Sequence, residues 1–146
     1  YSLYDKGSRP VDIGLYLEYI LPRVGYKDSE EIEFKAILEK DISDFTVTLN
    51  PTFEKKVSGE VEEGIEFAFA GGVYYKRNLS IIPGIEFYSK MGELRETRGF
   101  DEQSAFIFPT VNILFLQNFQ WHVGAGFGLS DNSDDVLLKS ILSFGY

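Results

Sequence analysis

The sequence contains no cysteine and has only one histidine, one tryptophan and one methionine among its 146 residues. Without cysteine the chain can have no disulfide framework, no thiol nucleophile and no cysteine-based metal site. Basic residues are also scarce, because 14 lysines and arginines stand against 23 aspartates and glutamates, a formal net charge of -9. No basic stripe is present that could follow a phosphate backbone, so we expect no nucleic-acid partner.

Long apolar runs are also missing. No segment approaches the roughly 20 apolar residues of a membrane-spanning helix, and none has a convincing helical period. Membrane β-barrels stay open as a class, because they cross the bilayer with short alternating strands. No basic-then-apolar leader begins at Tyr1, so we expect a chain that is either mature or begins partway into a longer protein.

Aromatic residues and glycine are abundant, with 13 Phe, 9 Tyr and 14 Gly. This composition favours a β protein with girdles of aromatic side chains over a helical protein. The length predicts a single domain, residues 1–146, or part of one.

Apolar residues alternate with polar or small residues in eight segments. Successive side chains of a β-strand point to opposite faces, so each segment predicts a strand with one apolar face. The predicted strands span residues 11–21, 31–39, 45–54, 65–73, 79–88, 104–116, 119–129 and 136–146. Pro51, Pro83 and Pro109 count against this assignment unless bulges absorb them, because proline cannot donate a hydrogen bond to a neighbouring strand.

The lengths of the connections alternate. Tight links are expected at residues 40–44, 75–78 and 117–118, and longer loops at 22–30, 55–60, 89–103 and 130–135. In an antiparallel meander, this alternation puts every tight link at one end of the strands. Outer-membrane barrels have that asymmetry, with short periplasmic turns and long outer loops.

The second face of the strands combines polar residues with glycine and alanine. Small residues are needed where side chains crowd an enclosed space, whereas glycine on an exposed strand only weakens it. We therefore expect the apolar face to meet lipid and the other face to line a lumen. The lumen-facing candidates are Glu18, Glu33, Lys35, Glu39, Glu66, Glu86, Asn112, His122 and Lys139.

The apolar face also carries aromatic residues near the predicted strand ends, where a membrane interface would favour them. These residues are Tyr19, Phe53, Tyr75, Phe87, Trp121 and Tyr146. The last strand places Leu138, Leu142, Phe144 and Tyr146 on a single face that ends in an aromatic residue.

Residues 11–19, 38–49, 83–88 and 124–135, with the last strand, resemble a broad family of Gram-negative outer-membrane barrels. The family contains porins and transporters, including the MetA-type barrels of phenol-degradation pathways. The resemblance implies a bacterial outer-membrane location, contact with lipid and no catalytic residues. It also implies assembly by the barrel-assembly machinery, which would read Leu138, Leu142, Phe144 and Tyr146 as an assembly signal.

Members of that family are usually longer, with further strands before the segment that matches residues 11–19. The resemblance therefore allows a C-terminal part of a barrel of about twelve strands. Residues 1–10 would then be the end of an upstream strand and a periplasmic turn. The alternative is that the eight strands close on themselves.

Motifs for catalysis are weak. His122 has no identifiable nucleophile or orienting partner, and the spacing Gly124-x-Gly126-x-Gly128 does not fit a dinucleotide-binding loop. The acidic turn at residues 131–135 lacks the ligand spacing of an EF-hand. We expect no enzyme activity, no cofactor and no metal.

The leading prediction is an all-β, antiparallel, up-and-down transmembrane β-barrel that acts as a porin-like channel for passive passage of small solutes. Two alternatives stay open. A filled barrel would serve as a structural or partner-binding subunit of an outer-membrane complex, together with other outer-membrane subunits. A soluble ligand-binding β-barrel would have its apolar face inside.

Overall fold

The computed structural model describes residues 5, 7–21, 30–58, 64–97, 99–116 and 118–145. The predictions made for residues 1–4, for most of the 22–30 loop and for Tyr146 lie outside these residues.

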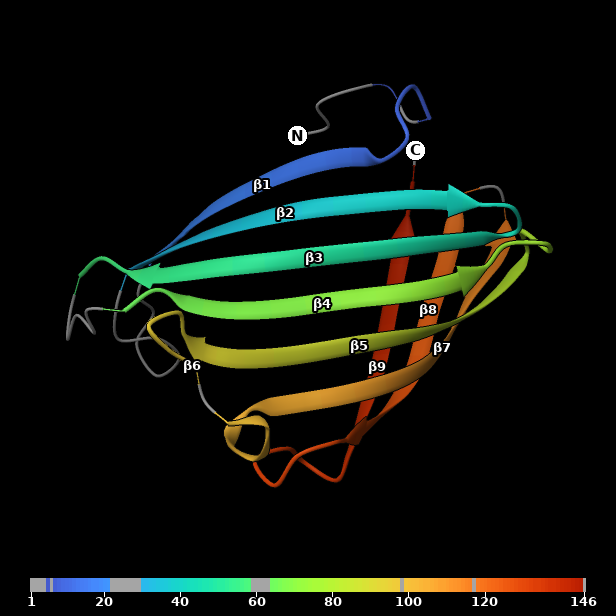
Figure 1. Ribbon diagram of the computed structural model, residues 1–146. Helices are drawn as coiled ribbons and strands as arrows, with labels where there is room; N and C mark the ends of the chain where they lie inside the picture. Colours follow the sequence, from blue (N-terminus) through green and yellow to red (C-terminus); the bar gives the residue numbers. More distant parts are fainter. Residues whose placement is uncertain are drawn as a thin grey trace.

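Eight long strands follow one another in the sheet in the same order as in the sequence (Figure 1). Every neighbouring pair is antiparallel, which confirms the predicted all-β, up-and-down arrangement of eight strands. The strands are β1 (Asp12–Ile20), β2 (Glu31–Ile42), β3 (Phe45–Lys56), β4 (Glu66–Tyr75), β5 (Ile81–Glu93), β7 (Ser104–Leu116), β8 (Phe119–Gly128) and β9 (Val136–Phe144).

The connection after β5 is shorter than predicted. The polar run from Ser89 indicated a loop, but β5 continues to Glu93 and pairs there with the two-residue strand β6 (Glu96–Thr97). A single 3-10 turn, η1 (Phe100–Glu102), precedes β7. The prediction of a loop was wrong because Ser89 is a buried strand residue, paired with Phe69 and Ala105, whose hydroxyl donates to Gln103 Oε1 at 3.0 Å.

The strand bounds place tight and long connections at opposite ends. Residues 43–44, 76–80 and 117–118 link strands at one end, which we name the turn end. Residues 21–30, 57–65, 94–103 and 129–135 link strands at the other, the loop end. Ser43, which has a positive φ of 53°, allows the sharp reversal between β2 and β3.

Proline is accommodated by interrupting the sheet on one side only. The β2–β3 pairing passes from Lys35↔Thr52 to Leu38↔Leu49, while Pro51 stays in register with Phe69 on β4. The β7–β8 pairing has a similar gap at Pro109, which stays in register with Ile85 on β5. Proline lacks one donor, so it disturbs only the neighbour that would have accepted from it.

The sheet curls strongly but is open in the described residues. In Figure 1, β1 to β5 lie side by side across the front, β7 follows β5 along the bottom, and β8 and β9 pass behind them. Strands β1 and β9 are the two ends of the sheet, and no pairing joins them in the described parts of the chain. In the described residues, these eight strands therefore do not close into the barrel predicted from the sequence.

The curl has a polar concave face and an apolar convex face. Lys139 on β9 reaches Glu86 on β5 across the two intervening strands, so their shared face is the inside of the curl. Glu86 is 3% exposed, and Thr46, Thr52 and Thr110 on the same face are also buried. By contrast, Leu17 is 72% exposed on the convex face, and Leu138 is 86% exposed. This distribution is the reverse of a water-soluble protein with an apolar core.

Candidate functional site

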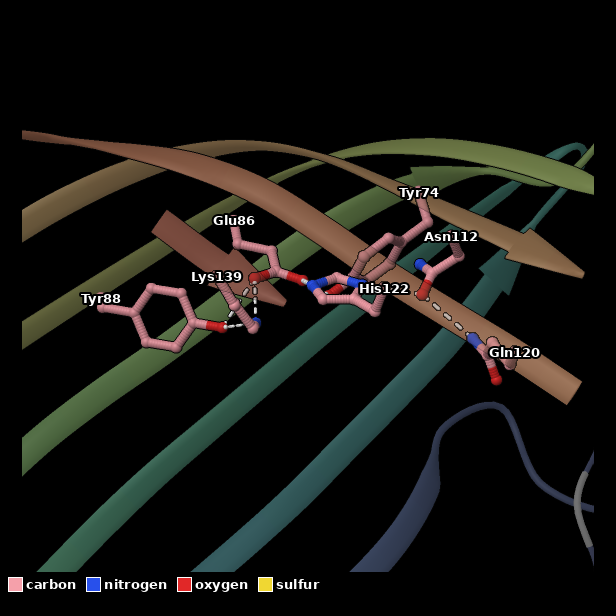
Figure 2. A network of polar contacts seen from close by, with 7 residues as sticks. All are labelled: Tyr74, Glu86, Tyr88, Asn112, Gln120, His122 and Lys139. Atoms are coloured by element: carbon pink, nitrogen blue, oxygen red, sulfur yellow. Dashed lines mark hydrogen bonds and ion pairs between the residues drawn. The ribbon is translucent and has the colours of Figure 1, made fainter. Parts of the chain in front are cut away.

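Glu86 lies at the centre of a polar network on the concave face (Figure 2). One carboxylate oxygen, Oε2, accepts hydrogen bonds from Lys139 Nζ at 2.7 Å and from the Tyr88 hydroxyl at 2.6 Å. The other oxygen, Oε1, accepts from the Tyr74 hydroxyl at 2.7 Å, and His122 Nε2 lies 3.2 Å away. The carboxylate is thus held by groups from β4, β5, β8 and β9. A buried charge is tolerated when it is paired and hydrogen-bonded in this way.

Glycine makes this long reach possible. Lys139 is in register with Gly124 on β8, then with Thr110 on β7 and Gly84 on β5. Three strand spacings of about 4.8 Å separate β9 from β5. With no side chain at Gly124 on β8 or at Gly84 on β5 itself, the lysine can lie across the sheet to Glu86.

Glycine also leaves room for inward-pointing rings. A Cβ atom on Gly84 would lie 2.4 Å from Tyr74 Cδ1, and one on Gly126 would lie 2.2 Å from Phe108 Cζ. Both distances are below any normal contact, so neither ring could keep its position beside alanine. The small residues of this face therefore match the bulky residues that cross it.

His122 is held in place by amide side chains. Its Nδ1 lies 2.7 Å from Asn112 Oδ1, which also accepts from Gln120 Nε2 at 3.0 Å. The opposite ring nitrogen, Nε2, faces the Glu86 carboxylate without the alignment of a hydrogen bond. The ring therefore forms one wall of the Glu86 site, and its contacts with Asn112 and Glu86 orient it there.

A hollow of about 510 Å³ lies beside the network, toward the loop end. Tyr88 belongs to both, so this residue connects the network to the hollow. The floor is apolar, with Ala68, Ala70 and Phe106. The charged lining residues are Glu33, Lys35, Glu54, Glu66 and Lys90. The size is in the ordinary range for a small-molecule site.

The structure brings together four of the nine lumen-facing candidates. Glu86, Asn112, His122 and Lys139 share the network, whereas Glu33, Lys35 and Glu66 line the hollow. Glu33 and Lys35 form an ion pair of 2.9 Å. Glu39 is half-buried on β2, and Glu18 on β1 is exposed and accepts from the Tyr16 hydroxyl at 2.6 Å.

The sequence-based selection missed Tyr74, Tyr88 and Gln120. Their signal was available, because each has the same alternation parity as the polar residues of its strand. Tyr88 even follows Glu86 by two residues. Charged residues are the more obvious signal in a sequence, whereas the tyrosine hydroxyls and the Gln120 amide support the network without carrying charge.

The proposed assembly signal lies on the convex side of β9. Leu138, Leu142 and Phe144 are 86%, 63% and 70% exposed. Tyr146, the fourth member, is outside the described residues. Three apolar side chains thus form one exposed row at the edge of the sheet.

In the described parts of the chain, no group of three or more His, Asp or Glu residues is arranged to hold a metal ion. No helix in the same residues is long and apolar enough to cross a membrane. A scan of protein-family models finds no match to this chain, and a search of curated proteins also finds none.

Proposed function

We propose that the protein is a β-barrel of the bacterial outer membrane and that its polar interior lets small solutes pass. One observation carries the proposal: the buried face of the sheet is mainly polar, with Phe106 and Phe108 as its buried apolar side chains, and the exposed face is apolar. In water such an exposed apolar surface would be unfavourable, since monomeric soluble proteins rarely expose apolar patches larger than a few hundred Å². Lipid is the environment in which this arrangement is stable.

Aromatic rows on the convex face support a membrane position. Near the loop end, Phe53 contacts Phe34 and Phe67, with ring centroids 6.4 and 5.1 Å apart. Near the turn end, Phe45 and Tyr75 are 5.1 Å apart. Phe45 and Phe53 are eight residues apart on β3, about 26 Å along the strand at about 3.3 Å per residue. Outer-membrane barrels have aromatic girdles on either side of an apolar band about 25 Å tall.

The row at the turn end continues onto β7 and β8. Phe115 lies 6.1 Å from Trp121 and 5.9 Å from Phe119, and the Trp121 indole donates to Ser140 Oγ. Amphipathic rings are favoured where one end of the side chain is apolar and the other is wet. Phe87 does not join either row, because β5 extends beyond its predicted end and leaves this residue in the middle of the strand.

A membrane position requires the free strand edges to be paired, since lipid offers no hydrogen bonds. The proposal therefore includes barrel closure, either by direct pairing of β1 with β9 or through further strands between them. The lipid-facing row on β9 would serve as the segment that the barrel-assembly machinery reads.

The hollow supports solute passage. It is lined by charged and hydroxyl groups. Its volume of about 510 Å³ is far larger than the water-sized voids of a close-packed core. Eight strands closed on themselves would leave an interior only wide enough for side chains. A specific observation thus favours a second function, a filled barrel that serves as a structural subunit of an outer-membrane complex: the Glu86 network crosses the interior from β5 to β9.

Fractionation and bilayer recording together test these functions. We expect the protein to stay with outer membranes through an alkaline wash and, after purification in detergent, to give stepwise conductance in planar bilayers. Membrane association without conductance would favour the filled barrel. A protein that leaves the membrane and stays dispersed without detergent would overturn the membrane proposal and favour a soluble ligand-binding barrel.

A further inference from the structure

We propose that Glu86, Tyr88 and Tyr74 form a binding site for a primary ammonium group, that Lys139 fills it in the resting protein, and that small organic ammonium ions are the solutes that can take its place. This inference rests on the proposed passage of solutes and names the solute class.

The surroundings of Lys139 Nζ have the chemistry of ammonium recognition. The ammonium donates to Glu86 Oε2 at 2.7 Å and to the Tyr88 hydroxyl oxygen at 2.7 Å. It also lies 5.1 Å from the centroid of the Tyr88 ring. A carboxylate, a hydroxyl and an aromatic ring are the groups that hold ammonium ions in proteins.

The site is organised by groups other than Lys139. Tyr74 and Tyr88 each donate a hydrogen bond to the Glu86 carboxylate, one to each oxygen. Tyr74 is itself confined above Gly72 and Gly84, where added Cβ atoms would lie 2.8 Å and 2.4 Å from its side chain. Glu86 would therefore keep its orientation when the lysine leaves, as a binding site requires.

A solute could reach this site from the hollow. Tyr88 lines the hollow and also binds the Lys139 ammonium. Three carboxylates of the lining, from Glu33, Glu54 and Glu66, stand against the two lysines Lys35 and Lys90, and Lys35 is paired with Glu33. The approach thus favours a cation over an anion.

Chemical rescue tests the site without requiring a channel. Lys139→Ala removes the equivalent of propylammonium from the side chain. We expect the variant in detergent to unfold at a lower temperature than the parent protein, and added propylammonium to restore the midpoint. Propionate, which has the wrong charge, and tetramethylammonium, which cannot donate, should not restore it. Glu86→Gln in the Lys139→Ala background should abolish the rescue.

A refolding experiment and a second variant cover the case in which Lys139→Ala does not fold. If Lys139→Ala does not fold alone, propylammonium present during refolding is expected to recover it, and the isosteric Lys139→Met variant should gain nothing because its side chain fills the space. Rescue that is equal for propylammonium, propionate and tetramethylammonium would overturn the proposal. The proposal would also be overturned if propylammonium rescued Lys139→Ala neither in thermal unfolding nor in refolding.

Ion selectivity gives an independent readout. In bilayers under a salt gradient, Lys139→Met leaves the Glu86 charge unopposed and should shift the reversal potential toward cation selectivity. Glu86→Gln leaves Lys139 unopposed and should shift it toward anions. Lys76→Met is the matched control, since it removes a lysine from the exposed 2.7 Å pair with Asp41 at the turn end, and it should leave the reversal potential unchanged.

The two proposals fail in different ways. If the parent protein gives no conductance, the channel function is contradicted. Propylammonium rescue of Lys139→Ala would still establish the ammonium site. Conductance whose selectivity is the same in Lys139→Met and Glu86→Gln would keep the channel and overturn the role of this site.

Discussion

At the scale of single residues, the interior depends on pairing the smallest side chains with the largest. Gly126 on β8 lies beneath the Phe108 ring, and Gly84 on β5 lies beneath Tyr74. Backbone freedom is not the reason for glycine here, since neither residue has a positive φ. These glycines are required because a neighbouring ring occupies the place of their side chain.

Gly126→Ala should therefore destabilise the protein by about 1–3 kcal/mol, the usual cost of overpacking. The measurement is denaturant unfolding of the purified protein in detergent. Gly99→Ala is the matched control, since a Cβ atom on Gly99 would have no neighbour within 4 Å and its φ of -56° suits alanine. Equal stability of the two variants would show that Phe108 moves aside without cost.

At the scale of the strands, each element has two faces that meet different surroundings. On β5, Ile81 and Ile85 are exposed on the convex face, whereas Glu86 and Tyr88 lie on the concave face, where Glu86 is buried. Alternation alone separates the two sets, but it does not say which set is covered. The curl of the sheet decides that, because it encloses the polar set.

The substitution Ile85→Arg tests whether the convex face contacts lipid or water. Ile85 is 57% exposed and lies in the middle of β5, in register with Val73 and Pro109 on the neighbouring strands. In a bilayer, arginine there should cost about 2–4 kcal/mol. Against water, an exposed substitution of this kind usually stays within about 0.5 kcal/mol. Unfolding in detergent or lipid vesicles measures the difference.

Leu94→Arg serves as the control for that experiment. Leu94 is also exposed, at 48%, but it lies beyond the end of β5 at the loop end. It should tolerate arginine in either environment. A convex face that accepts arginine at residue 85 as readily as at residue 94 would contradict the lipid contact.

At the scale of the whole molecule, the eight strands form one curled sheet with a polar interior and two free edges. The interior has two regions, a hollow toward the loop end and the Glu86 network, which meets the hollow at Tyr88. The proposed functions differ in which region dominates. Solute passage uses the hollow and requires the contacts of the Glu86 network to open. A filled structural barrel requires these contacts to stay formed.

Much of this arrangement could be predicted from the order of residues. Alternation located all eight strands, since a period of two is a local property that needs no tertiary contact to read. Connection lengths predicted the turn end and the loop end. The predictions failed where polar residues continue a strand, as at Ser89, because a polar side chain can be buried in a sheet with a hydrogen-bond partner as well as exposed in a loop.

The sequence by itself determined the strands, their antiparallel order and the composition of their two faces. Only the tertiary structure decided which polar residues meet. Glu86 and Lys139 are 53 residues apart, and their contact depends on the register of four strands and on the curl that carries β9 back toward β5. Barrel closure is likewise a tertiary property, because it depends on how β1 and β9 are paired rather than on the alternation within either strand.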